Sequence, residues 1–226
     1  GYGTRGDWGK RPALLIIDVS YGFTGEKDEP ILDSIKTWPN SCGHFAWRSI
    51  PYLKRMLDAA RVKGLPVIYT TGQYRNDQWD MGSWVWKNGR TDDWDGRGQN
   101  RDGNDIVDEI APQPQDIVIR KLKPSAFSST PLNSFLTLLG ADSLIVTGTS
   151  TSGCVRASVI DAFSQNYRVT LAEEGCFDRS EASHAINLCD MNAKYANVVP
   201  TDEVIDYINT LPEELFDLPS GKPMGI

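Results

Sequence analysis

Short apolar runs alternate with segments of helical periodicity along most of this chain, and this alternation constrains its fold more than any other feature. Largely apolar runs of strand length occur at 13–17, 65–70, 116–121, 143–146, 167–172 and 196–199. Helical spacing of apolar residues covers 49–63, 131–139, 154–165 and 180–195, and a last helix is expected from an N-cap at Thr201-Asp202. Repeated strand-then-helix order favours a parallel sheet with helices on both faces. We predict a three-layer α/β/α fold with a mostly parallel sheet of about six strands.

Composition and charge indicate one domain and exclude several classes of partner. The chain has 226 residues, 40% hydrophobic and 23% charged, which is enough for one ordinary core over 1–226. No apolar run approaches the roughly 18 residues of a membrane span, and the polar beginning does not resemble a signal peptide. The net charge of -7 disfavours nucleic acids and anionic membranes, because both attract basic surfaces. We therefore expect a cytoplasmic protein that binds neither.

One long stretch, at about 75–105, interrupts the alternation. It shows no helical or strand periodicity and contains four tryptophans, Trp79, Trp84, Trp86 and Trp94. A loop of this length in a compact domain is usually a functional loop or disordered. Because buried tryptophans would repay the cost of ordering it, we predict that this irregular segment forms a pocket wall or a contact between subunits.

A cysteine stands where a predicted strand turns into a predicted helix. Cys154 follows the run 143–146 and begins the helical segment 154–165. Unpaired N–H groups and the positive end of the helix dipole favour an anionic thiolate at such a position. The alternative is a small apolar core residue, because free cysteines are among the most buried residue types.

Two further reactive side chains stand at the carboxyl ends of predicted strands. Asp18 follows the first apolar run, and Lys121 ends the third. Open parallel sheets place ligands at this edge, so Asp18, Lys121 and Cys154 together suggest a base, a charge stabiliser and a nucleophile. The alternatives are that Asp18 caps a turn and that Lys121 is solvated.

The other cysteines, Cys42, Cys176 and Cys189, show no C-x-x-C spacing. Free thiols are therefore expected rather than disulfides or a zinc site. A thiol redox protein remains an alternative function, although no partner cysteine is placed in the sequence to resolve a disulfide.

Three ordered blocks resemble the isochorismatase-like cysteine hydrolases. They are Asp18 after its apolar run, KLKPSAF at 121–127, and GTSTSGCV at 148–155, and the similarity covers residues 10–207. The resemblance implies the isochorismatase-like fold and a catalytic triad of Asp18, Lys121 and Cys154. In that triad, the aspartate would deprotonate the cysteine and the lysine would stabilise the thiolate.

Within this superfamily, further segments look like the N-carbamoylsarcosine amidase branch. They are residues 150–158, 178–184 and 187–195, and maleamate amidases share much of the same pattern. The resemblance implies an amidohydrolase that releases ammonia from a small ureido or primary-amide substrate, with a carboxylate on that substrate. A maleamate-type amidase or another small-amide hydrolase is the alternative, and a catalytically idle hydrolase-fold binding module is the non-enzyme alternative.

The resemblance also implies the groups around the substrate. The oxyanion donors would be the backbone amides of Ser150 and Cys154, with a cis peptide bond between Thr149 and Ser150. Arg179 matches a family arginine that holds a substrate carboxylate, which suits a guanidinium fork; an ion pair with a neighbouring carboxylate is the alternative. Thr151 is a candidate hydrogen-bond partner of the ligand, and a capping role is its alternative.

Nicotinamidases in the same superfamily bind a metal through an Asp-x-His pair and a further histidine. This chain offers no such pair, and its only histidines are His44 and His184. A lone histidine is more often structural than a ligand, so we expect no metal and no cofactor. Family members are commonly tetramers, which implies a homotetramer here.

Overall fold

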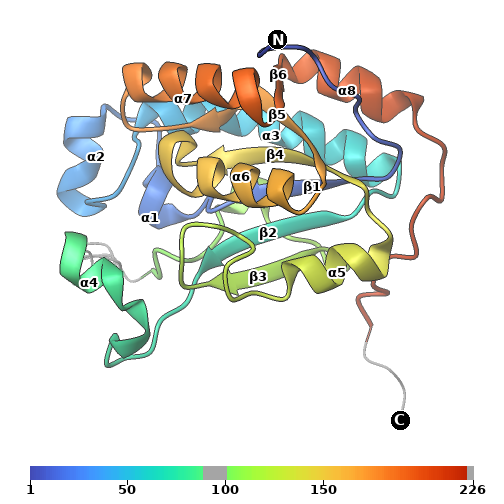
Figure 1. Cartoon of the computed structure of the whole chain (residues 1–226). Helices are drawn as coiled ribbons and strands as arrows, with labels where there is room; N and C mark the ends of the chain where they lie inside the picture. The colour runs from blue at the N-terminus through green and yellow to red at the C-terminus, as the bar shows by residue number, and fades with distance from the viewer. Residues whose placement is uncertain (89–100, 223–226) are drawn as a thin grey trace.

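A six-stranded parallel sheet forms the centre of the computed structural model, which describes residues 1–88 and 101–222 (Figure 1). The strands are β1 (Pro12–Ile17), β2 (Val67–Gly72), β3 (Ile117–Lys121), β4 (Ser143–Thr149), β5 (Arg168–Phe177) and β6 (Asn197–Val199). Their order is β3-β2-β1-β4-β5-β6, and each neighbouring pair is parallel. The fold class predicted from the sequence is confirmed.

Helices cover both faces of the sheet (Figure 1). Helices α3 (His44–Val62) and α8 (Thr201–Thr210) pack on one face, and α5 (Leu132–Leu139), α6 (Arg156–Ser164) and α7 (Glu181–Lys194) on the other. The short helices α1 (Tyr21–Thr24), α2 (Ile31–Thr37) and α4 (Ser83–Asn88) lie at the end of the sheet. Short 3-10 turns occur at Trp79–Met81 and Asp108–Ile110.

The central strand β1 supplies both hydrophobic cores because successive side chains of a strand point to opposite faces. Leu14 and Ile16 pack in the core that contains residues of α3 and α8. Ala13, Leu15 and Ile17 pack in the core that contains residues of α5, α6 and α7. This two-sided burial explains why the strand is a continuous apolar run.

Two strands extend further than their apolar runs predict. β4 continues to Thr149 and β5 to Phe177, and the extensions pair Gly148 with Cys176 and Thr149 with Phe177. The added residues include Thr147, Gly148 and two glutamates, so hydropathy alone does not reveal them. The last helix also differs from the prediction, because Pro200 occupies its N-cap position and Thr201 is its first residue.

Several short elements contradict or extend the sequence prediction. The structure adds helices α1 and α2 to the predicted set, and α3 begins at His44 because Ala46 continues its buried stripe. The prediction of an irregular stretch was wrong for 83–88, which forms α4, while Trp94 lies outside the described residues. Trp86 is 85% exposed in this chain, so not all of these tryptophans are buried.

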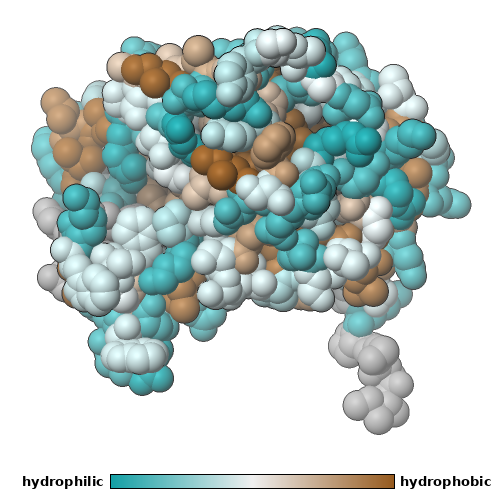
Figure 2. Space-filling model, in the orientation of Figure 1, coloured by the Kyte–Doolittle hydropathy of each residue, from teal (hydrophilic) through white to brown (hydrophobic). Residues whose placement is uncertain are grey.

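The outer surface is mixed in character. Figure 2 shows hydrophilic residues over most of one face, with hydrophobic residues gathered in small separate patches. Among the described residues, no helix has both the length and the apolar character needed to cross a lipid bilayer.

The strands β1 and β4 approach each other closely at Gly148. Its φ of 103° lies in the left-handed region, and a Cβ atom built there would stand 2.1 Å from the carbonyl oxygen of Ile17. Only glycine fits this position without moving one strand away from the other. The contact fixes the spacing of the two strands at their carboxyl ends.

We expect Gly148→Ala to lower the free energy of unfolding by about 3 kcal/mol, because it adds both backbone strain and overpacking. For a chain of this size that loss corresponds to a fall in Tm of roughly 6–12 °C. Gly64→Ala is the matched control, since Gly64 also has positive φ but a Cβ added there would meet no atom within 4 Å. Equal losses in Tm for the two variants would contradict the close approach of the strands.

Candidate active site

The order of the strands reverses between β1 and β4. From β1 the chain continues through β2 to β3 on one side of the sheet, and from β4 through β5 to β6 on the other. Open parallel sheets bind ligands beyond the carboxyl ends of the strands at such a reversal. Asp18 follows β1 directly and Cys154 lies a few residues after β4, so both belong to this point of the sheet.

Lys121 reaches this point from two strands away. It is the last residue of β3, and since adjacent strands lie about 4.8 Å apart, roughly 10 Å separates β3 from β1. The long lysine side chain spans that gap, and Nζ donates to Asp18 Oδ2 at 2.7 Å and to the carbonyl oxygen of Lys123 at 3.1 Å. Asp18 and Lys121 are only 3% and 6% exposed.

Both carboxylate oxygens of Asp18 have a donor. Thr70 on β2 donates from its hydroxyl to Oδ1 at 2.8 Å, while Lys121 donates to Oδ2. Asp18 itself adopts a φ of 53°, which is unusual for a residue other than glycine. The structure therefore orients this carboxylate firmly instead of leaving it to cap a turn in solvent.

Lys121 connects the carboxylate to the cysteine. Burial alone would lower the pKa of Lys121, but the negative charges of Asp18 and Cys154, and hydrogen bonds to both, raise it above its ordinary value. Lys121 consequently stays protonated at neutral pH. Its ammonium group supports negative charge on either neighbour, and the alternative of a solvated lysine is wrong.

Cys154 lies in a single wide turn between β4 and α6. The turn spans Thr151–Val155 and contains Gly153, whose φ of -117° and ψ of -105° are not helical. The amides of Gly153 and Val155 donate to the carbonyl oxygen of Ser150 at 2.8 and 3.2 Å, and the Thr149–Ser150 peptide bond is cis. α6 itself begins one residue after this turn, so Cys154 precedes the helix that the sequence placed it in.

The turn is held from the side of β5 and α7. Asp178 Oδ2 accepts from the amide of Ser152 at 2.8 Å. The hydroxyl of Thr151 donates to the carbonyl oxygen of Phe177 at 3.1 Å and also pairs with Nδ1 of His184 at 2.8 Å. Burial lowers the pKa of His184, which favours a neutral imidazole in this structural role.

The structure does not place the side chain of Thr151, a predicted ligand contact, on the cavity. Its side chain is 0% exposed, and its hydroxyl is engaged by Phe177 and His184. It does not line the cavity next to Cys154. The capping alternative came closer, because Thr151 stabilises the turn that carries the cysteine.

A cavity of about 520 Å³ opens beside the cysteine. The residues that line it come from the nucleophile turn, from the segments around α1 and α2, from α4, and from the segments that follow β3 and β5: Phe23, Asn40, Trp84, Lys87, Pro124, Ser150, Ser152, Gly153, Cys154 and Arg179. The three short helices gather beyond the carboxyl ends of the strands, at the left of Figure 1. Cys154 is partly exposed there, so it is not a core residue.

Arg179 lines the cavity, and its guanidinium contacts Ser150, Asn40 and Phe23. Its guanidinium donates to Ser150 Oγ at 3.1 Å and to the carbonyl oxygen of Asn40, and it lies 5.5 Å from the ring centroid of Phe23. Within the described part of the chain, Arg179 forms no ion pair with Asp178. The alternative of a neighbouring carboxylate as its partner is therefore wrong.

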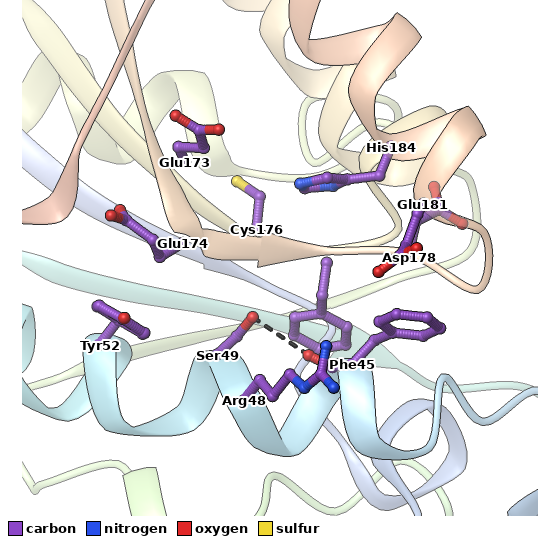
Figure 3. Close-up of a pocket in the computed structure, with 11 residues that line it drawn as sticks. Phe45, Arg48, Ser49, Tyr52, Glu173, Glu174, Cys176, Asp178, Glu181 and His184 are labelled. Carbon is purple, nitrogen blue, oxygen red and sulfur yellow. Dashed lines mark hydrogen bonds between the residues drawn. The ribbon is translucent and has the colours of Figure 1, made fainter. Parts of the chain in front are cut away.

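A second cavity, of about 290 Å³, lies between α3, β5 and the start of α7 (Figure 3). Acidic side chains from β5 and α7 face α3 across it, together with His184, and its cysteine is Cys176. Burial raises the pKa of Cys176 to about 12 and that of Cys42 to about 11. Neither buried thiol ionises at neutral pH, so Cys154 is the better nucleophile.

The sequence predicts no metal centre. Across residues 1–88 and 101–222, no group of three or more His, Cys, Asp or Glu side chains is arranged to hold a metal ion.

Several residues of this site escaped sequence reasoning. Trp84 and Lys87 lie in a segment without clear periodicity, and Asn40 contributes a backbone carbonyl that no side-chain pattern reveals. Asp178 stands in the sequence only as a neighbour of Arg179, but it holds the turn through Ser152. The available signal was the density of tryptophans around Trp84, which predicted either a pocket wall or a contact between subunits.

Comparison with known proteins agrees with this geometry. Residues 12–203 match the isochorismatase domain family. The chain is 36% identical to N-carbamoylsarcosine amidase of an Arthrobacter species, over 94% of this chain and 77% of that protein. It is 29% identical to maleamate amidohydrolase of Pseudomonas putida, over 93% and 92% of the two chains. A solved isochorismatase family protein from Desulfovibrio vulgaris superposes with a TM-score of 0.73 at 26% identity, covering 89% of this chain and 100% of the other.

We expect iodoacetamide at pH 7 to label Cys154 severalfold faster than the exposed Cys189, because Lys121 stabilises the thiolate of Cys154. Cys42 and Cys176 should stay unlabelled in the folded protein. Peptide mass spectrometry over time measures all four rates, and Cys154→Ser should remove only the fast site. Labelling of Cys42 or Cys176 as fast as Cys154 would refute the assignment.

Proposed function

The chain belongs to the isochorismatase family, and from that premise we propose that it hydrolyses the C–N bond of a small amide through a thioester on Cys154. Its relatives include an N-carbamoylsarcosine amidase and a maleamate amidohydrolase, both named for amide hydrolysis. The observation that carries the proposal is the 2.7 Å contact of Lys121 with Asp18, made by an ammonium group that also interacts with Cys154.

The first step is the activation of the thiol. Asp18 accepts the proton of Cys154, and the Lys121 ammonium stabilises the thiolate that results. An ordinary thiol, with a pKa of about 8.5, is only a few per cent ionised at neutral pH. A neighbouring cation stabilises a thiolate, so Lys121 increases the nucleophilic fraction of Cys154.

The thiolate then attacks the carbonyl carbon of the substrate. A carbon–sulfur bond forms and the carbonyl electron pair moves to oxygen, where the amides of Ser150 and Cys154 donate to the oxyanion. Support for this role comes from the position of both residues on the cavity wall, in the turn beside β4. Collapse of the tetrahedral intermediate breaks the C–N bond.

Asp18 completes the cycle as acid and then as base. It gives its proton to the departing nitrogen, and ammonia leaves. Water then attacks the thioester, passes one proton to Asp18, and the carbon–sulfur bond breaks; the proton returns to Cys154. The sum is one amide and one water converted to one acid and one ammonia, and for a ureido substrate that acid is a carbamate.

The substrate in this proposal is a small ureido or primary-amide compound with a carboxylate held by Arg179. The position of its guanidinium at the cavity, 3.1 Å from Ser150 Oγ and clear of the neighbouring carboxylates, supports that role. A planar guanidinium binds a carboxylate with two parallel hydrogen bonds. A homotetramer in the cytoplasm belongs to the same proposal and rests on the family resemblance alone.

We expect Cys154→Ala to abolish ammonia release and Asp18→Asn to lower kcat by about 10³-fold, the size of a general acid–base contribution. An ammonia assay over ureido acids, maleamate and nicotinamide measures both. Cys189→Ser is the control, because Cys189 is exposed on α7 and should keep the full rate. Wild-type rates in Cys154→Ala would contradict the mechanism and favour an idle binding module.

A further inference from the structure

Helix α4 forms one wall of the catalytic cavity. Trp84 and Lys87 stand three positions apart, so they lie on the same side of the helix, and both line the cavity with Cys154. Trp84 is half-buried, whereas its neighbours Val85 and Trp86 are exposed, at 45% and 85%. The side of α4 that carries Trp84 is thus turned toward the cavity, and Lys87 lines the cavity from an exposed position.

Two hydrogen bonds connect this wall to the segment that directly follows Lys121. The indole Nε1 of Trp84 donates to the carbonyl oxygen of Leu122 at 3.1 Å. The ammonium of Lys123 donates to the carbonyl oxygen of Met81, just before α4, at 2.9 Å. Because Leu122 and Lys123 directly follow Lys121, α4 is held at a defined position relative to the catalytic lysine.

The described wall of the cavity differs in charge from the molecule as a whole. The whole chain carries a net charge of -7, yet the charged residues among the described lining of the cavity are the cations Lys87 and Arg179. Of the residues the structure describes, no Asp or Glu lines this cavity. The nearby Asp18 is buried beneath it and paired with Lys121 at 2.7 Å.

The two cations differ in what they already bind. Arg179 is oriented by Ser150 and Asn40. Lys87 forms no ion pair with any described residue, and its side chain is exposed. A cavity of 520 Å³ is within the range of about 300–1,000 Å³ that encloses drug-sized ligands, so there is room beyond a single-carboxylate ureido acid.

From these observations we propose that Lys87 is a second anion-binding group of the active site, and that the substrate is a ureido or amide compound with two anionic groups. One anionic group contacts Arg179 and the other contacts Lys87, while the scissile carbonyl lies at Cys154 in the same cavity. Trp84 supplies an apolar wall, and its hydrogen bond to Leu122 holds the helix that carries Lys87. This inference rests on the proposed hydrolase function and specifies its substrate class.

The test compares two ureido acids that differ by one carboxylate, N-carbamoyl-aspartate and N-carbamoyl-2-aminobutyrate. For the wild type we expect a higher kcat/KM with the diacid. Lys87→Met should lower kcat/KM for the diacid about five- to tenfold, mainly by raising KM, because a partly exposed charge pair contributes only a modest binding free energy. The same variant should leave kcat/KM for the monoacid within about twofold of the wild type. Lys87→Arg should restore most of the diacid value.

Two controls separate the charge of Lys87 from general effects. Lys54→Met removes an exposed lysine of α3 outside the cavity and should change neither substrate. Arg179→Ala should weaken both substrates, because each carries the first carboxylate. The diacid preference should also fall as NaCl is raised, since salt screens exposed charges.

Calorimetric binding to Cys154→Ala decides the question even without turnover. Tighter binding of the diacid, lost in Cys154→Ala/Lys87→Met, supports the second anionic subsite. Three results would overturn it: Lys87→Met weakens the binding of both compounds equally, the protein with Lys87 binds both compounds with equal affinity, or neither compound binds. A failure of the proposed hydrolase function would give a different result: the wild type would bind the diacid but would not release ammonia from any amide tested.

Discussion

A buried ion pair between Asp18 and Lys121 organises the carboxyl edge of the sheet. Removing one partner of such a pair typically costs about 3–5 kcal/mol, because the other charge remains buried without compensation. The pKa of Lys121 is higher in the folded chain than the ordinary lysine value of 10.5. The ion pair therefore stabilises the fold fully below pH 10.5, and this stabilisation is lost only as the pH rises through the higher pKa of the folded state. At neutral pH the pair is intact and the ammonium remains available to the thiolate of Cys154.

The topology explains why three residues far apart in the chain converge there. β1 and β4 are neighbours although they are separated by β2 and β3 in the sequence, and Gly148 lets them approach closely. Asp18 and the nucleophile turn therefore begin side by side. Lys121 comes from β3, and only a long side chain reaches Asp18 across β2, which is why a lysine rather than a shorter donor suits this position.

The parts of the fold that depend on local hydrophobic pattern were predictable, and so were the residues at strand ends. Each of the six strands contains one of the predicted apolar runs. Asp18 and Lys121 stand at the ends of their strands, and Cys154 follows β4 by a few residues. The tryptophans at 79–94 predicted a pocket wall or a subunit contact, but the helix α4 that forms the wall was not predictable, because six residues are too few to show a helical period. Its position depends on the bond from Trp84 to Leu122, a contact across 38 residues that no local pattern encodes.

The central claim is that Asp18, Lys121 and Cys154 act as one unit. A double-mutant cycle on kcat/KM with Asp18→Asn and Lys121→Met measures this directly, with circular dichroism to establish that each variant is folded. Residues that act as a unit are strongly non-additive, so the double variant should lose little more than the worse single variant. Losses that add in full, as they do for independent residues, would contradict the account.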